Sequence, residues 1–105
     1  MASGKLGSAD LAAGADTLLY TVPASTVSTL NIRIASRNSV PAKIRVAIGA
    51  GACPAVADYI DYDVSVGASG ILEDTGIVCG AGEKVWVRSD LANASVRVHG
   101  FEEAV

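Results

Sequence analysis

The amino-acid sequence predicts an all-β fold: an antiparallel β-sandwich, of jelly-roll or immunoglobulin-like type, with about seven or eight strands and a short N-terminal arm. Three observations lead to this prediction. Apolar and polar residues alternate along the chain with a period of two, which is typical of half-buried strands. Valine and isoleucine fill the inward positions, as a pleated sheet favours. Turn residues recur at short, regular intervals, as they do in sandwiches and barrels.

The composition limits the class of protein. The 105 residues are 50% hydrophobic and 18% charged, and the formal net charge is −3. A disordered chain would be more charged and less apolar, and a non-specific nucleic-acid binder would be basic. No apolar run approaches the roughly 20 residues of a membrane-spanning helix. We therefore expect one small folded domain that binds neither nucleic acid nor a membrane.

Residues 1–15 are expected to form an N-terminal arm, and residues 16–105 a single β-sandwich domain. The segment 9–15 is rich in alanine, but Gly7 and Gly14 bracket it and no apolar stripe develops. At most one helical turn is therefore predicted in the arm.

The expected strands begin with 16–22, which ends at the turn that contains Pro23. The next two, 26–36 and 42–49, show the clearest alternation, and a polar turn that ends at Pro41 separates them. Glycine, proline and asparagine mark such turns because each suits a backbone conformation that strands avoid.

The later strands are bounded by glycine-rich turns. Residues 57–64 and 70–78 flank one such turn, and a break inside 70–78 would raise the number of strands to eight. The last two, 83–89 and 94–101, alternate valine with polar residues. Over the whole chain the alternation predicts as core positions Leu30, Ile32, Ile34, Ile44, Val46, Ile48, Val85, Val87, Val96 and Val98.

Two groups of residues could carry chemistry. Asp61 and Asp63 are expected to share one strand face with Tyr59, as a calcium or sugar site or, as we favour, as a solvated face. The spacing of an EF-hand loop is missing there. His99 is the only histidine, and no serine lies in a G-x-S-x-G nucleophile turn. We expect no enzyme, no metal and no cofactor.

Four arginines and one tryptophan are candidates for an interaction surface. All five lie at outward positions of their strands, and both residue types are enriched at binding hot spots. If the strands are neighbours, the arginines form one positive stripe that meets acidic residues of another subunit. Ordinary surface charge is the alternative, and for the tryptophan the alternative is a place in the core. These residues are Arg33, Arg45, Trp86, Arg88 and Arg97.

Cys53 and Cys79 are too few for a structural zinc site, which takes four ligands. They could form one disulfide, within or between chains, or remain reduced and act as small hydrophobic residues. A reducing cytosol favours free thiols, whereas a particle released into an oxidising environment favours the bond.

Four stretches of the chain resemble small virion-associated proteins of tailed bacteriophages. They are KLGSADLAAGADTLLYTVPA at 5–24, DYIDYD at 58–63, GILEDTG at 70–76 and VRVHGFEE at 96–103. The resemblance implies a non-enzymatic subunit, present in many copies, that decorates or stabilises the capsid, neck or collar, or tail. Its implied partners are itself, as a trimer or hexamer, and other virion proteins. It would be made in the host cytoplasm and reside in the virion.

A monomeric carbohydrate-binding module is the alternative from another class. Tyr59, Tyr62 and Trp86 would then stack on sugar rings, and nearby carboxylates would accept hydrogen bonds from sugar hydroxyls. Burial of both Tyr59 and Trp86 would exclude that alternative. A small hydrolase has no supporting motif in the sequence.

Overall fold

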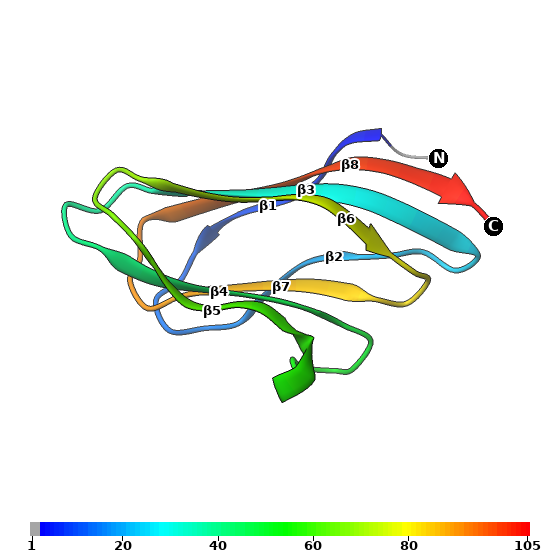
Figure 1. Cartoon of the computed structure of the whole chain (residues 1–105), viewed down its shortest axis with the longest axis horizontal. Helices are drawn as coiled ribbons and strands as arrows, with labels where there is room; N and C mark the ends of the chain where they lie inside the picture. The colour runs from blue at the N-terminus through cyan, green and yellow to red at the C-terminus, as the bar shows by residue number, and fades with distance from the viewer. Residues whose placement is uncertain (1–2) are drawn as a thin grey trace.

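The computed structural model describes residues 3–105 as two four-stranded antiparallel sheets packed face to face (Figure 1). Sheet A has the strand order β1-β8-β3-β6, and sheet B has the order β2-β7-β4-β5. A single 3₁₀ turn, η1, precedes β5. The elements are β1 Ser3–Leu11, β2 Thr17–Thr21, β3 Thr26–Ser36, β4 Ala42–Gly49, η1 Val56–Asp58, β5 Tyr59–Val66, β6 Ile71–Cys79, β7 Lys84–Ser89 and β8 Ala94–Ala104.

The strands pair in a nested order. β1 pairs with β8, β2 with β7, β3 with β6 and β4 with β5, all antiparallel, so the second half of the chain runs back along the first. Eight strands connected in this way form a jelly roll. The predicted β-sandwich is therefore confirmed, and its connectivity is that of the jelly roll rather than of the immunoglobulin fold.

The core lies between the sheets and follows the predicted alternation. In β3 every second side chain is buried, and β7 shows the same pattern. Of the ten predicted core positions, nine are buried, and Ile48 is half-buried and packs against the others. Close packing of branched aliphatic side chains from both inner faces stabilises the sandwich.

The N-terminal segment is a strand and not an arm. Residues 3–11 form β1, whose register on β8 runs from Ser3 opposite Phe101 to Leu11 opposite Ala94. Leu11 is buried in the core. Small residues hide this strand in the sequence, because two of the inward positions of β1, opposite the buried Val98 and Val96 of β8, are Gly7 and Ala9. Residues 1 and 2 of the expected arm lie outside the described residues.

Gly7 has a packing role that differs from the expected one. A Cβ atom at this position would lie 2.3 Å from the carbonyl oxygen of Leu19 on β2. The backbones of β1 and β2 therefore approach each other closely here, which only glycine permits.

The break expected inside 70–78 is a β-bulge. Gly76 has a φ of 67°, and its N–H donates to the side-chain oxygen of Asn31 at 3.0 Å. β6 continues on both sides of it. Among the described residues, no helix has the length and apolar character needed to cross a membrane.

Candidate interaction face

The outer face of sheet B brings together two of the four candidate arginines, Arg45 and Arg88, and most of the aromatic residues. Leu18, Trp86, Ala47 and Tyr59 lie opposite one another on β2, β7, β4 and β5. Directly opposed residues of an antiparallel pair share a face. We call this surface the sheet B face and define it by Leu18, Arg45, Tyr59, Tyr62, Asp63, Trp86 and Arg88 together with the adjoining Pro54 and Val56.

A bulge in β5 determines which side chains reach this face. Val64 lies opposite Ile44 and Asp61 opposite Val46, so that Tyr62 and Asp63 together oppose Arg45. Asp63 has a φ of 52°. Such a bulge shifts the alternation of the strand. The expectation that Asp61 and Asp63 share a face is therefore wrong, because Asp63 points outward and Asp61 points toward the interior.

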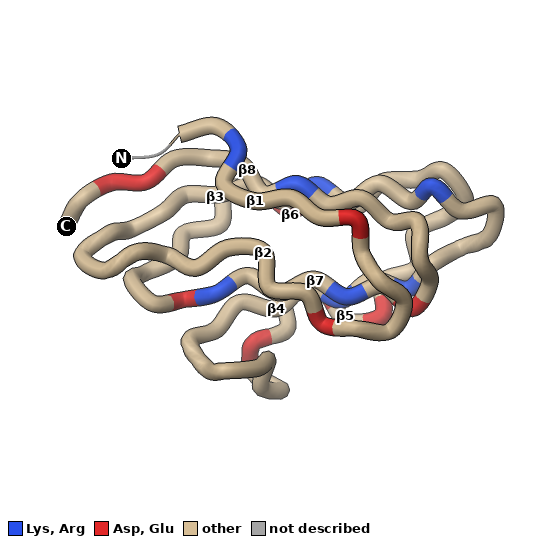
Figure 2. Tube along the Cα trace, turned by 180° about the vertical axis from the view of Figure 1, so that it is seen from behind, with Lys and Arg blue, Asp and Glu red and all other residues tan. Residues whose placement is uncertain are grey.

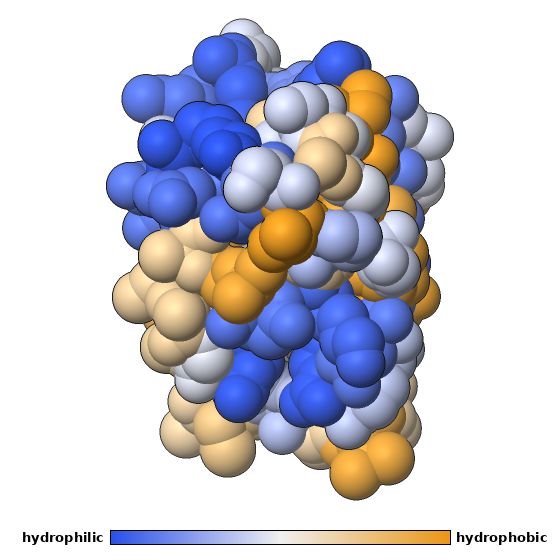
Figure 3. Space-filling view, turned by 90° about the vertical axis from the view of Figure 1, so that its left-hand side faces the viewer, coloured by the Kyte–Doolittle hydropathy of each residue, from blue (hydrophilic) through white to orange (hydrophobic). Residues whose placement is uncertain are grey.

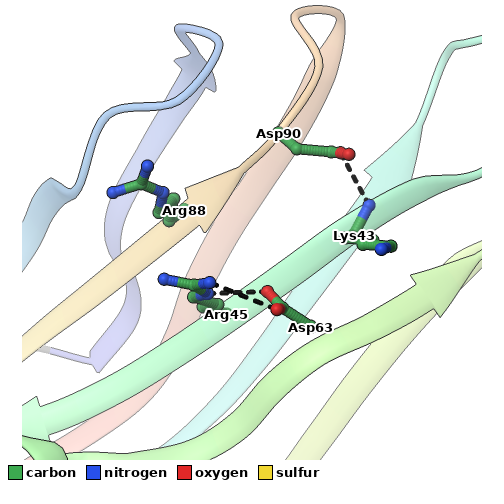
Figure 4. Close-up of a pocket in the computed structure, with 5 residues that line it drawn as sticks. All are labelled: Lys43, Arg45, Asp63, Arg88 and Asp90. Carbon is green, nitrogen blue, oxygen red and sulfur yellow. Dashed lines mark hydrogen bonds and ion pairs between the residues drawn. The ribbon is translucent and has the colours of Figure 1, made fainter.

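Arg45 is held by two partners on the bulged strand. Its Nε donates to Asp63 Oδ1 at 2.6 Å and its Nη2 to Oδ2 at 3.2 Å (Figure 4). Its Cζ also lies 4.1 Å from the centre of the Tyr62 ring. This forked ion pair with a cation–π contact fixes the guanidinium group. The hydrogen bonds from Arg45 lower the pKa of Asp63.

A small charged hollow adjoins this pair. It has a volume of about 160 Å³, and Lys43, Arg88 and Asp90 complete its lining. Asp90 Oδ1 accepts a hydrogen bond from the backbone N–H of Lys43 at 2.7 Å, which fixes the turn after β7 beside β4. Arg88 Nη1 lies 3.9 Å from Asp16 Oδ2. The two arginines of the hollow, Arg45 and Arg88, therefore each have an acidic group close by.

An aromatic groove lies on the other side of Tyr62. The rings of Tyr59 and Tyr62 meet edge to face, with centres 5.0 Å apart and planes at 85°. Pro54 and Val56 complete a groove of about 560 Å³. Val56 is 93% exposed, so the groove is open to an apolar ligand or partner.

The loop that carries Pro54 and Val56 is tied to β4. Asp58 accepts a hydrogen bond from the backbone N–H of Ala55 at 2.9 Å. Its carboxylate lies against Gly49, where a Cβ atom would come within 2.2 Å of it. The wall of the groove is therefore built on the sheet rather than on a free loop.

The predicted positive stripe does not form. Arg45 lies opposite Arg88 on sheet B, whereas Arg33 lies opposite Arg97 on the outer face of sheet A. Figure 2 shows basic positions along both sheets. Arg33 also pairs with Glu73 at 3.2 Å. The four arginines therefore form two cross-strand pairs on opposite faces, because β3 and β8 belong to one sheet and β4 and β7 to the other.

At the loop end of the sandwich the exposed apolar side chains are more scattered than on the sheet B face. Figure 3 shows this end, which is formed by the turns that precede β2, β4, β6 and β8, as mostly hydrophilic with small apolar areas. Val40 and Ile71 are each 53% exposed near these turns. No aromatic pair accompanies them in the described part of the chain.

The two cysteines lie in different environments, and both are free. Cys53 is exposed in the loop after β4, whereas Cys79 is buried at the end of β6. Burial raises the pKa of the Cys79 thiol to about 11, which makes it a poor nucleophile. The two cysteines do not form a disulfide with each other within the chain, and Cys79 is a small hydrophobic residue of the core.

The histidine and the acidic residues remain to be placed. His99 lies on β8 of sheet A, opposite Asn31 on β3. Between residues 3 and 105, no group of three or more histidine, cysteine, aspartate and glutamate side chains is arranged to hold a metal ion.

One constellation was missed in the sequence. Asp74 on β6 and Asp61 on β5 meet at the edge of the sandwich, and burial together with the neighbouring Asp61 raises the pKa of Asp74 to about 7. The sequence does contain one sign that Asp74 points inward: it lies two residues after Leu72, at an inward position of the strand. The position of Asp61 opposite it depends on how β5 and β6 are placed, which no local pattern reveals.

These side chains make the sheet B face a surface suited to binding. Its rings, its open groove and its fixed guanidinium group lie on three adjacent strands, β7, β4 and β5, and on the segment that precedes β5. Comparison with known proteins adds no assignment: no protein-family model, no curated protein and no solved structure matches this chain.

Proposed function

We propose that this chain is a non-enzymatic structural component of a tailed-bacteriophage virion, which decorates or stabilises the capsid, neck or collar, or tail. In this proposal the sheet B face binds neighbouring subunits, which are copies of the chain itself or other virion proteins. The virion context comes from the sequence resemblance. The single observation that supports a binding role is the contiguous aromatic and arginine-bearing surface across sheet B.

The composition and rigidity of this surface support protein–protein contact. Tryptophan, tyrosine and arginine are the residues most enriched at binding hot spots. Tyr62 is 59% exposed, yet it packs against both Arg45 and Tyr59. A side chain that is already ordered loses little conformational freedom on binding, so more of the contact energy becomes affinity.

The fold is compatible with the proposal but does not select it. Jelly rolls build viral capsid proteins, and they also build lectins. A shared architecture hosts unrelated functions, so the function has to be argued from the site.

Light scattering of the purified chain tests the proposal through its oligomeric state. We expect a trimer or hexamer that Tyr62→Ser or Val56→Ser converts to smaller species. Phe101→Ser is the matched control, because Phe101 is a 44% exposed aromatic residue on the opposite sheet. Dissociation by Phe101→Ser but not by the sheet B variants would contradict the role of the sheet B face. A strictly monomeric wild type would contradict self-association.

The carbohydrate-binding module remains a second candidate because of the Tyr59–Tyr62 groove. Tyr59 and Trp86 are both half-buried, so the condition that would have excluded it is not met. The rings of Tyr59 and Tyr62 stand at 85°, however, and do not form one flat stacking platform. Binding on a glycan array that is lost in Tyr62→Ser, by a monomeric protein, would favour this candidate over the virion component.

A further inference from the structure

β5 and β6 are edge strands of different sheets, and each directs one carboxyl group into the space between the sheets. Asp61 lies opposite the fully buried Val46, and Asp74 lies opposite the fully buried Ile32. Because opposed residues share a face, both aspartates point inward at the edge of the sandwich. An inward-pointing charge in such a position needs a partner.

The partner of each carboxyl group is the other one. Asp61 lies close enough to raise the pKa of Asp74, both as a hydrogen-bonding neighbour and through its charge. The Oδ2 atom of each is buried, and neither finds an N–H or O–H donor elsewhere in the described chain. An ionised carboxylate only accepts hydrogen bonds, so the bond between the two groups exists only while one of them keeps its proton.

The charged groups nearby point away from this pair. Glu73, which precedes Asp74 in the sequence, forms an ion pair with Arg33 on the outer face of sheet A. Arg45 and Asp63 pair on the outer face of sheet B.

The residues that flank the two aspartates on the inner side of their own and the neighbouring strands are apolar. They are Ile32, Ile44, Val46, Val64, Leu72 and Ile77. Burial is the largest single cause of the raised pKa of Asp74, and Asp61 is the one ionisable group of the described chain that contributes to it.

We propose that Asp61 and Asp74 form a proton-operated clasp at the β5–β6 edge. While the pair shares a proton, the hydrogen bond joins the edge strands of the two sheets. When that proton is lost, two like charges face each other in a partly buried space, and the edge loosens. The clasp itself does not depend on the proposed function. Its effect on partner binding does, because β5 also carries Tyr62 and Asp63 of the sheet B face.

The direction of the pH dependence follows from proton linkage. The pKa of Asp74 rises from its ordinary value of 3.8 to about 7 in the folded chain. Between these values the folded state binds more protons than the unfolded state, so stability falls as the pH rises. The penalty is absent below the lower value and complete above the higher one.

Thermal unfolding of the full chain at several pH values tests the clasp. We expect the wild type to melt at progressively lower temperature from about pH 4 to about pH 7, the window set by the two pKa values, and to change little above it. Asp74→Asn and Asp61→Asn should each flatten this decline and raise the melting temperature at pH 8 by on the order of 4 °C.

Asp63→Asn is the matched control, because Asp63 is on the same strand but faces outward and pairs with Arg45. The pKa of Asp63 is lowered, so its loss should not raise the melting temperature at pH 8. Backbone hydrogen exchange adds a local readout: between pH 6 and pH 8, protection corrected for intrinsic rates should fall in β5 and β6 but not in β1 and β2.

Three results would overturn the proposal. The first is an unchanged pH dependence in Asp74→Asn. The second, which needs no variant, is a carbon-13 titration of the wild type in which the carboxyl groups of Asp61 and Asp74 both ionise near the ordinary value of 3.8. The third is stabilisation of the wild type, but not of Asp74→Asn, by millimolar Ca²⁺ at pH 8, which would make the pair a cation site.

Discussion

The two long edges of the sandwich are closed by different kinds of contact. At the β1–β2 edge, Leu6, Ala9 and Leu19 pack against the core, and the backbone of β2 passes directly over Gly7. At the β5–β6 edge, Asp61 and Asp74 meet instead. The packing at the β1–β2 edge depends on shape and persists at any ordinary pH. The contact at the β5–β6 edge depends on a proton. Inward-pointing charge also discourages a sheet edge from pairing with another chain.

A polar tie strengthens the β1–β2 side further. The hydroxyl of Tyr20 on β2 donates to Glu102 Oε2 at 2.5 Å and lies 2.7 Å from Ser28 Oγ. It thereby connects an edge strand of sheet B to both central strands of sheet A. Burial, and after it the hydrogen bond to Glu102, raises the pKa of Tyr20 to about 12. This tie is therefore insensitive to pH across the range in which the aspartate pair titrates.

The largest expected effect comes from removing β1. Deletion of residues 3–11 uncovers the edge of β8 and removes Leu11 from the core. We expect the shortened chain to lose its cooperative thermal transition, because the free energy of unfolding of a domain of this size is small. Circular dichroism during heating measures this. A cooperative transition at the wild-type temperature would instead show that the segment behaves as the arm that the sequence predicts.

A smaller effect is expected where the backbones of β1 and β2 cross. In Gly7→Ala the new methyl group would lie 2.3 Å from the carbonyl oxygen of Leu19, so the two strands must separate. We expect the free energy of unfolding in urea to fall by about 1–3 kcal/mol, as in other overpacked sites. Gly67→Ala is the control, since a Cβ atom there meets nothing within 4 Å. Equal stability of the two variants would contradict the close approach.

The smallest expected effect is that of Tyr20→Phe. The change removes the hydroxyl that joins Ser28 and Glu102, and we expect a loss of about 1 kcal/mol in the free energy of unfolding. Because the pKa of Tyr20 is about 12, the loss should be the same at pH 6 and pH 8, unlike the effect of Asp74→Asn. Urea titration at both pH values checks this, with the exposed Tyr62→Phe as control. A loss that changes with pH would mean that the two edges are not independent.

Residues with a strong local pattern were predictable, and residues whose place depends on distant strands were not. In β3 and β7, β-branched residues and strict alternation agree, so both the strands and their core positions could be read from the sequence. β1 has too few large apolar residues to show its inward face. Its burial comes from β8, at the other end of the chain.

The candidate site was predictable only in part. Arg45, Trp86 and Arg88 do share a face, as their strand phase predicts. Asp61 was misplaced, because the register shifts in β5 change the phase of the strand without any sequence mark such as glycine. Arg33 and Arg97 were grouped with the wrong face, because membership in one sheet or the other is set by pairing between distant segments.

The nested pairing has a consequence for how the chain is synthesised. Ser3 pairs with Phe101, so β1 is synthesised before the other seven strands of this sandwich and finds its partner only when the last of them has been made. Until then Leu11 and the edge of β1 remain open to other chains. Contacts between such distant segments slow folding, because a long loop must close before they form. Crowded synthesis of many copies would therefore expose this chain to misassembly, and chaperones that bind extended apolar segments would have time to act on it.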